Sequence, residues 1–190
     1  MTTPRRPRSK PTGRANKGEP SAGGGPQHGR TDLRHEIGKR RPFDLPEQEA
    51  YLNIVRTASV LGVEFERLFR GYGLSESAYN AMRILRGAMT GPGAPGRKTC
   101  MEIGAQMVTP VPDVTRVIDR IERLGFAERR RFSADRRVMH VSLTRKGLDL
   151  LAAIDQPLLD LHRRQLGHMT EDELRVLSDL LSKARSSKPR

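Results

Sequence analysis

Apolar side chains recur with helical spacing between residues 112 and 125. The apolar positions are Val114, Val117, Ile118, Ile121 and Leu124. This spacing places them on one stripe of an amphipathic helix, so one side of that helix must be buried. Pro112 suits the first helical turn, and Gly125 is a typical residue to end it. The opposite, polar face consists of Asp113, Thr115, Arg116, Asp119, Arg120 and Arg123.

A second, shorter helix is predicted immediately upstream. Thr99 and Glu102 have the spacing of a capping box, in which Thr99 caps the helix and Glu102 reaches back to the Thr99 amide. This helix should run to about residue 107 and be joined to the next by a tight connector at 108–111. Two helices in this order, the second with a polar leading face, predict a helix-turn-helix over residues 99–125.

A β-hairpin is predicted to follow, over residues 126–144. Met139, Val141 and Leu143 alternate along its second strand, and Ser133, Ala134 and Asp135 have the composition of a hairpin tip. Arginines flank this tip on both sides, at Arg129, Arg130, Arg131, Arg136 and Arg137. Guanidinium groups held this close repel unless they share an anion, and phosphate suits their geometry. The alternative is a solvated hairpin whose arginines pair with Glu128 and Asp135.

Longer apolar stripes lie on both sides of this segment. In residues 46–71 the stripe comprises Tyr51, Ile54, Val55, Ala58, Leu61, Phe65, Leu68 and Phe69. In residues 145–185 there are two, made of Leu148, Leu151, Ile154, Leu158 and Leu161 and of Leu174, Leu177, Leu180, Leu181 and Ala184. Another helix, capped by Ser75, should turn Met82 and Leu85 inward. The predicted fold class is therefore mainly α with a small β-wing, a winged helix-turn-helix between terminal helices.

Composition and charge narrow the functional classes. The chain has 190 residues, a net charge of +13 and one cysteine, Cys100. A single cysteine excludes an internal disulfide and favours a reducing, cytoplasmic compartment. There is no apolar run of membrane-spanning length and no secretory signal near the start, so we expect no membrane partner. The five histidines (His28, His35, His140, His162 and His168) lack metal-ligand spacing. We expect no enzyme activity, no cofactor and no metal.

The first part of the chain differs from the rest in composition. Residues 1–44 are rich in Pro, Gly, Arg and Lys, with 11 basic against 4 acidic residues. Such a segment cannot bury enough apolar surface to offset its chain entropy, so we expect a disordered basic arm. It could add non-specific phosphate contacts or be a passive extension. The folded domain is then predicted over 45–185, with a short tail at 186–190.

The hairpin sequence resembles the wing of the MarR (multiple antibiotic resistance regulator) transcription factors. The family motif Asp-x-Arg-x-x-x-Val-x-Leu-Thr is present at Asp135, Arg137, Val141, Leu143 and Thr144. The usual glycine follows at 147, and the helix over 114–122 with its Leu-Gly-Phe exit is also similar. The resemblance covers roughly residues 47–185. One departure is the opening of the second helix, Thr109-Pro110-Val111-Pro112-Asp113, where family members often have a small polar residue, so a base preference cannot be transferred.

The resemblance implies a homodimer, formed by helices 46–71 and 145–185, that binds an inverted repeat in double-stranded DNA. Amphipathic terminal helices could also simply enlarge a monomer core. For the major groove we select Thr115 and Arg116, aided by Asp113. Arg120 and Arg123 should touch phosphates or pair with neighbouring acids. At the wing, Arg136 and Arg137 should reach the minor groove or its phosphates, with Asp135 orienting Arg137.

The family also implies a small effector, commonly an anionic aromatic or phenolic molecule, between the dimer helices and the DNA-reading segment. Tyr51, Phe69, Tyr72 and Tyr79 are the candidate pocket residues, with ordinary core packing as the alternative. Cys100 could act as a redox switch or as a small packing residue. The predicted function is a ligand-responsive, sequence-specific DNA-binding repressor. The competing hypothesis is a constitutive architectural or protein-interaction module that has kept the winged helix without sensing.

Overall fold

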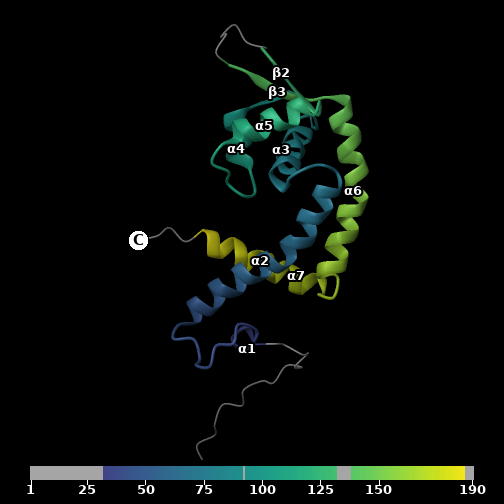
Figure 1. Cartoon of the computed structure of the whole chain (residues 1–190). Helices are drawn as coiled ribbons and strands as arrows, with labels where there is room; N and C mark the ends of the chain where they lie inside the picture. The colour runs from purple at the N-terminus through teal and green to yellow at the C-terminus, as the bar shows by residue number, and fades with distance from the viewer. Residues whose placement is uncertain (1–31, 92, 132–137, 187–190) are drawn as a thin grey trace, which may run out of the picture. The chain divides into compact units, whose positions relative to one another are not determined.

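A computed structural model of the chain describes residues 32–91, 93–131 and 138–186 (Figure 1). Contacts divide the chain into two compact units, Met1–Glu49 and Ala50–Arg190. The described helices are α1 (Leu33–Glu36), α2 (Pro46–Gly71), α3 (Glu76–Gly87), α4 (Cys100–Gln106), α5 (Val114–Arg123), α6 (Arg145–Leu166) and α7 (Glu171–Arg185). The described strands are β1 (Lys98–Thr99), β2 (Ala127–Arg130) and β3 (His140–Leu143). The fold is mainly α with a small sheet, as predicted.

The predicted helix-turn-helix is formed by α4 and α5, which pack against each other. Thr99 and Glu102 form the expected capping box at the start of α4. The Thr99 amide and hydroxyl donate to the Glu102 carboxylate at 2.7 and 2.8 Å, which lowers the pKa of that carboxyl. These bonds satisfy amide groups that a helix otherwise leaves unpaired at its first turn.

Helix α5 begins two residues later than the sequence pattern suggested. Asp113 is its N-cap, with an extended backbone and a side chain that accepts from the Arg116 amide, so Pro112 precedes the helix. Proline is common in the first turn of a helix. The Asp113 carboxylate can accept a hydrogen bond from a free amide of that turn, whereas Pro112 cannot, so Asp113 is the N-cap. At the other end Gly125 adopts a φ of 77°, a left-handed conformation that glycine adopts without strain, and ends the helix as expected.

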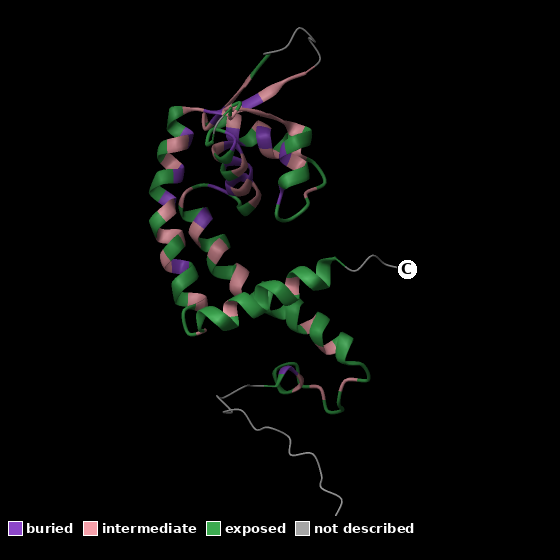
Figure 2. Ribbon diagram, turned by 180° about the vertical axis from the view of Figure 1, so that it is seen from behind, coloured by how far each residue is buried: buried purple, intermediate pink, exposed green. Residues whose placement is uncertain are grey.

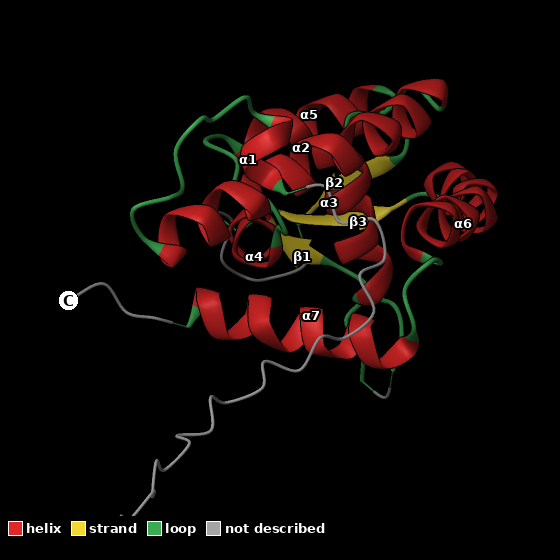
Figure 3. Ribbon diagram, turned by 90° about the horizontal axis from the view of Figure 1, so that it is seen from below, coloured by secondary structure: helices red, strands yellow, loops and turns green. Residues whose placement is uncertain are grey.

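Three antiparallel strands in the order β1-β3-β2 make up the sheet. In the pair of strands that forms the wing, Ala127 lies opposite Leu143 and Arg129 lies opposite Val141. Leu143 and Val141 are both buried. The hairpin prediction is confirmed for these strands. Strand β1 was not predicted, because two residues are too few to show an alternating pattern. Helices α4 and α6 lie on opposite sides of the base of the sheet (Figure 3).

The junction between the wing and α6 is closely packed. Thr144 caps α6 by accepting from the Gly147 amide, and its hydroxyl donates to the Gly125 carbonyl at 2.7 Å. A Cβ atom at Gly147 would overlap the Phe126 carbonyl, so glycine is required for this close approach. Strand β3, the exit of α5 and the start of α6 are therefore joined at one point.

The hydrophobic core connects α3, α4, α5, the sheet and α6 (Figure 2). Its largest fully buried side chains are Met82, Leu85, Ile103, Ile118, Ile121, Val141, Leu151 and Ile154. This set includes the inward residues predicted for α3 and two residues of the predicted α5 stripe. Burial of one such side chain contributes about 1.5–3 kcal/mol, so this cluster is the main source of stability in the second unit.

The terminal helices remain largely uncovered in the single chain. Only Phe69 is buried on α2, and no residue of α7 is buried. Tyr51 is 65% exposed, and the exposed apolar group also includes Ile54, Val55, Val176, Leu177 and Leu180. The bounds predicted for the first helix are confirmed, but its apolar stripe is buried only near the C-terminal end. The remaining apolar surface is available to another molecule.

The first unit contains one short helix that the sequence analysis did not anticipate. Helix α1 is capped by Asp32, which accepts from the Arg34 amide, and Leu33 is buried. The expectation of disorder throughout residues 1–44 is therefore wrong for this turn, because a capping aspartate and one apolar residue sufficed to form it. Residues 1–31 lie outside the described part of the chain, so the arm itself remains a prediction.

An ion pair fastens α3 to α6. Arg86 donates to both carboxylate oxygens of Asp155, at 2.7 and 2.6 Å, and its side chain is only 23% exposed. Hydrogen bonding to Asp155 raises the pKa of the Arg86 guanidinium. Arg83 reaches the same carboxylate at 3.4 Å but is 46% exposed. Arg83 and Arg86 therefore contact the same carboxylate, one through a single long contact and the other through two short hydrogen bonds.

We expect Arg86→Ala to lower the free energy of unfolding by about 1–3 kcal/mol, because it leaves Asp155 without its bidentate partner. Arg83→Ala should change it by less than about 0.5 kcal/mol, since an exposed, long contact is screened by water. Urea unfolding at one fixed protein concentration measures both. Equal losses in the two variants would contradict this ranking.

Candidate nucleic-acid interface and neighbouring cavity

The outer face of α5 carries the polar residues predicted from the sequence. Thr115, Arg116, Arg120 and Arg123 are all exposed, and Arg116 is 87% exposed. Helix α5 presents them because Ile118 and Ile121, on its other side, are fully buried. The predicted site residues on this helix are thus brought together on one accessible surface.

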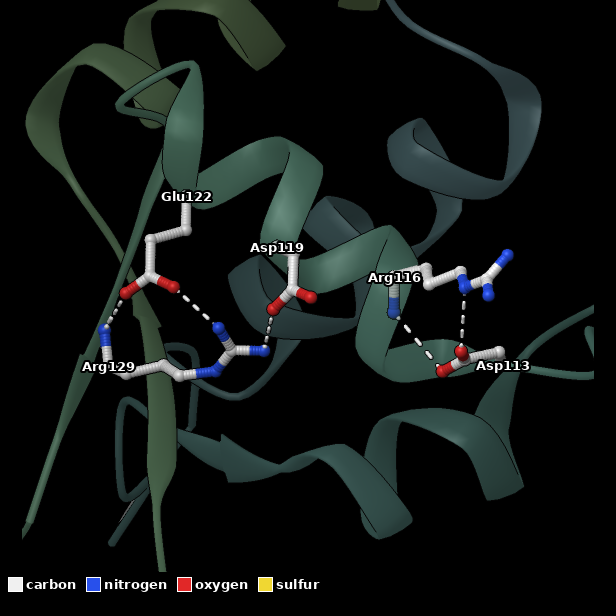
Figure 4. A network of polar contacts seen from close by, with 5 residues as sticks. All are labelled: Asp113, Arg116, Asp119, Glu122 and Arg129. Atoms are coloured by element: carbon white, nitrogen blue, oxygen red, sulfur yellow. Dashed lines mark hydrogen bonds and ion pairs between the residues drawn. The ribbon is translucent and has the colours of Figure 1, made fainter.

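Asp113 contacts Arg116 through both the backbone amide and the side chain of that arginine. Its carboxylate accepts from the Arg116 amide at 3.2 Å and pairs with the Arg116 side chain, also at 3.2 Å (Figure 4). Asp113 therefore fixes the start of α5 and holds Arg116 at its N-terminal end. Its contribution to major-groove recognition, as an acceptor for a cytosine amino group, stays a prediction.

The other two arginines of this face lack such partners. Within the described residues, Arg120 and Arg123 form no ion pair with any carboxylate. Arg116, Asp119, Arg120, Arg123 and Leu124 line a hollow on this face of α5. A helix surface with two unneutralised guanidinium groups is suited to an anionic partner.

The side chain of Arg129 on β2 points toward Asp119 and Glu122 of α5 (Figure 4). Its guanidinium pairs with Asp119 at 2.6 Å and Glu122 at 2.5 Å, and its own amide donates to Glu122 at 3.1 Å. Partial burial opposes the charged form, but the hydrogen bonds to Asp119 and Cys100 raise the pKa of this guanidinium overall. The side chain is 19% exposed. We call this group the Arg129 clamp.

The Arg129 clamp corrects the interpretation that five arginines meet at a projecting loop. Arg129 faces α5, because two carboxylates one turn apart on that helix neutralise it. Arg130 pairs with Glu128 at 2.9 Å, as the alternative reading of the hairpin proposed. Asp135, Arg136 and Arg137 lie outside the described residues, and their roles stay predictions. Periodicity alone could not reveal the clamp, although charge complementarity between Arg129 and Asp119 was a usable signal.

A cavity of about 780 Å³ adjoins α5 on the side of α2, α3 and α6. Its apolar lining includes Phe65, Phe69, Leu74, Tyr79, Met107 and Leu158. Polar residues at the lining include Glu66, Arg70, Glu76, Asn80, Arg120 and His162. Mostly apolar walls with a few polar groups are typical of small-molecule sites.

Only two of the four predicted pocket residues line this cavity. Phe69 and Tyr79 stack with ring centroids 4.3 Å apart, and both belong to the lining. Tyr72 instead donates to the Ala153 carbonyl on α6 at 3.3 Å, and Tyr51 lies twenty residues from the cavity end of α2. Burial, followed by the nearby Asp155 carboxylate, raises the pKa of the Tyr79 hydroxyl. The prediction missed Phe65, Leu158 and His162, which become neighbours only through the packing of α2 on α6.

The described residues lack the features of two other functional classes. They contain no cluster of three or more His, Cys, Asp or Glu side chains that could hold a metal ion. No described helix is long and apolar enough to cross a membrane. Cys100 is a free thiol of intermediate exposure that contacts Arg129, so it has a packing position at the base of the wing.

Comparisons with known proteins agree with this architecture. No family model matches the chain. A MarR transcription factor from Planctomyces limnophilus is 36% identical, with coverage of 74% of this chain and 98% of that one, at a TM-score of 0.55. The transcriptional repressor MprA from Escherichia coli K12 is 28% identical over 119 residues, 62% of this chain. That match spans 65% of the length of MprA.

More distant solved structures share the fold. Sco3205 from Streptomyces coelicolor, a MarR family regulator solved in complex with DNA, is 17% identical at a TM-score of 0.65 and covers 77% of this chain and 91% of its own. BpsR from Bordetella bronchiseptica is 19% identical at a TM-score of 0.65, with coverage of 78% of this chain and 100% of that one. The DNA binding of BpsR is regulated by 6-hydroxynicotinic acid. The helices and sheet thus define a winged helix-turn-helix protein. The chain belongs to the MarR family of transcription factors.

The Arg129 clamp generates a prediction about stability. Arg129→Ala should lower the free energy of unfolding by about 1–3 kcal/mol, because Asp119 and Glu122 lose a charge-assisted partner in a half-buried site. Arg130→Ala is the matched control one position along, because the Arg130 side chain is 61% exposed and its pair with Glu128 contributes at most about 0.5 kcal/mol. Arg129→Lys should recover only part of the loss, since an ammonium cannot bridge two carboxylates as a guanidinium does. Denaturant unfolding that ranks Arg130→Ala as the worse variant would refute this role.

Proposed function

We propose that this protein is a sequence-specific double-stranded DNA-binding regulator of transcription, and that it acts as a homodimer in the cytoplasm. The observation that carries the proposal is the outer face of α5. It exposes Arg116, Arg120 and Arg123 beside a wing that the Arg129 clamp holds against the same helix. Guanidinium groups on a helix of this width suit the major groove and its flanking phosphates. The DNA complex of Sco3205 supports the same use of the fold.

The dimer rests on the apolar surface of α2 and α7. Val176, Leu177 and Leu180 are exposed on α7, as are Tyr51, Ile54 and Val55 on α2. A second copy of the chain would cover this surface by two-fold symmetry, and a two-fold dimer matches an inverted repeat in DNA. The proposal assigns these helices to dimerisation and α5 with the wing to DNA.

The protein is further proposed to repress transcription until a small aromatic ligand binds in the cavity. The cavity has the volume and the mixed lining of a small-molecule site, and it adjoins α5. Regulation of BpsR by 6-hydroxynicotinic acid supports this proposal for the fold. The competing hypothesis, a constitutive module without sensing, lacks a use for this cavity.

Selection of bound sequences from a random DNA pool, followed by footprinting, tests the proposed function. A single preferred inverted repeat, with half-sites about 10 base pairs apart, is expected. A protected footprint that a small aromatic compound releases separates the regulator from the constitutive module. Absence of any sequence preference would refute the DNA-reading role.

Solution mass provides a prediction for the dimer. Light scattering at micromolar concentration should give twice the chain mass of 21.3 kDa. Leu177→Glu combined with Leu180→Glu should give the monomer, because buried charges at an interface lose their hydration. Asp179→Asn, on the same helix but without added charge at an apolar position, is the control and should stay dimeric. A monomeric wild type would contradict the proposal.

Helix and wing arginines should differ in their effect on DNA recognition. Arg116→Ala should cost about 1–3 kcal/mol, mainly on the preferred site, because a base contact carries sequence information. Arg137→Ala, in the wing segment outside the described residues, should weaken all sequences by a similar factor, as expected for a phosphate contact. Gel-shift titrations on preferred and scrambled duplexes compare them. Equal loss of sequence preference in both variants would show that the roles are assigned wrongly.

A further inference from the structure

The C-terminal end of α5 is held by side chains from the start of α6. The helix ends in a Schellman turn, in which the Phe126 amide donates to the Ile121 carbonyl at 2.9 Å and the Gly125 amide to the Glu122 carbonyl at 2.8 Å. This turn satisfies two carbonyls that the helix itself leaves unpaired. The carbonyls of Leu124 and Gly125 come next along the chain, and they take their donors from another element.

Lys146, in the first turn of α6, donates from its Nζ to the Leu124 carbonyl at 2.9 Å. The same ammonium lies 5.0 Å from the centroid of the Phe126 ring, within the range of a cation–π contact. Beside it, the Thr144 hydroxyl donates to the Gly125 carbonyl. Within the described residues Lys146 forms no ion pair. Its charge is therefore directed at the end of α5, where a cation complements the partial negative charge of a helix C-terminus.

This contact adjoins the proposed DNA surface. Leu124 lines the outer hollow of α5 beside Arg123. Asp113 caps the N-terminal end of the same helix, and the Arg129 clamp ties the helix to the wing. Lys146 supplies a third point of attachment, at the C-terminal end. A side chain that reads a base must be held within about 0.5 Å of its productive geometry, so support at both ends of the helix matters for recognition.

Two other roles for Lys146 must be distinguished from support of α5. An exposed lysine at a DNA surface commonly contacts phosphate, and such a contact adds to the affinity for every sequence and to its salt dependence. A purely structural lysine would change only the free energy of unfolding. A residue that sets the angle of α5 instead affects the preferred sequence most, because only that sequence gains from the base contacts.

We propose that Lys146 is a positioning residue for DNA recognition. Its ammonium holds the end of α5 against the first turn of α6 through the Leu124 carbonyl, and so fixes the angle at which α5 meets DNA. It acts through Leu124 and does not touch DNA itself. The inference rests on the proposed DNA-binding function and adds a residue outside both α5 and the wing on which sequence preference depends.

The first experiment compares full-length Lys146→Met and wild type on the preferred duplex and on a scrambled duplex, over a range of salt concentrations. Methionine keeps most of the side-chain length but lacks the charge and the donor. It should weaken binding to the preferred duplex by about fivefold, the effect of one hydrogen bond, and to the scrambled duplex by less than about twofold. The slope of log affinity against log salt should not change, because no phosphate contact is lost. Lys146→Arg, which keeps a cation and its donors, should restore most of the preference.

Arg145→Met is the matched control, because it removes one positive charge at the neighbouring position. The Arg145 side chain is 87% exposed and pairs with Asp149 of α6 at 2.9 Å. This variant should leave the ratio of the two affinities unchanged. The same unchanged ratio in Lys146→Met would overturn the proposal, whatever its effect on unfolding. A salt slope reduced by about 1.8 in Lys146→Met, or 0.9 per subunit, would overturn it as well and identify a phosphate contact.

The second experiment needs no DNA. Hydrogen exchange followed by mass spectrometry reports on the amides of Leu124, Gly125 and Phe126, which donate to carbonyls of α5. Without the Lys146 ammonium this turn should open more often, so its peptide should exchange about fivefold faster in Lys146→Met. Exchange in Arg145→Met should match the wild type. If circular dichroism shows Lys146→Met to be unfolded, Lys146→Gln, which is polar but uncharged, takes its place in both experiments.

The outcomes separate this inference from the proposed function. If the wild type binds no DNA sequence above background, the proposed function fails, while exchange still shows whether Lys146 holds the end of α5. If the wild type prefers its site and Lys146→Met keeps the full preference, the positioning role is refuted and DNA binding stands. Unchanged exchange in Lys146→Met would refute the contact on which the inference depends.

Discussion

The ion pairing of Arg129 with Asp119 and Glu122 is the interaction on which the geometry of the proposed DNA surface depends. A winged helix contacts DNA with two elements, and their separation must be fixed before either contact is productive. The Arg129 clamp fixes it by neutralising a strand cation with carboxylates from the helix. The same pairing offsets one of the two negative charges of Asp119 and Glu122, so this side of α5 repels an anionic partner less than the two carboxylates alone would.

The elements that the sequence predicted well are those with a strong local signal. The capping box of Thr99 and Glu102 placed the start of α4, and the spacing of Ile118 and Ile121 identified the buried side of α5. Local patterns failed where two residue types competed for one role, as at the start of α5, where Asp113 rather than Pro112 sets the boundary. They also failed for β1, whose two residues become a strand only by pairing with β3.

The candidate sites were predictable in proportion to how local they are. The polar face of α5 follows from helical periodicity alone. The cavity does not, because Phe65 and Leu158 are more than ninety positions apart and meet only when α2 packs near α6. Tyr51 and Tyr72 are aromatic like several cavity residues, but residue type alone does not tell which way a side chain points in the folded chain. Arg120 lines both the hollow on the outer face of α5 and the cavity, and this too depends on tertiary packing on both sides of one helix.

The close junction at Gly147 gives α6 a mechanical role. The helix is joined at its first turn to the base of the wing and at its last turn leads to α7. Its 22 residues, with Pro157 near the middle, span about 33 Å at 1.5 Å per residue, and a tilt of the whole helix by about 5° moves its far end by about 3 Å. Because residue 147 has no Cβ, the first turn of α6 lies directly against the Phe126 carbonyl. In the proposed dimer, α6 would therefore convert a small rotation between the two copies into a change in the distance between their two α5 helices.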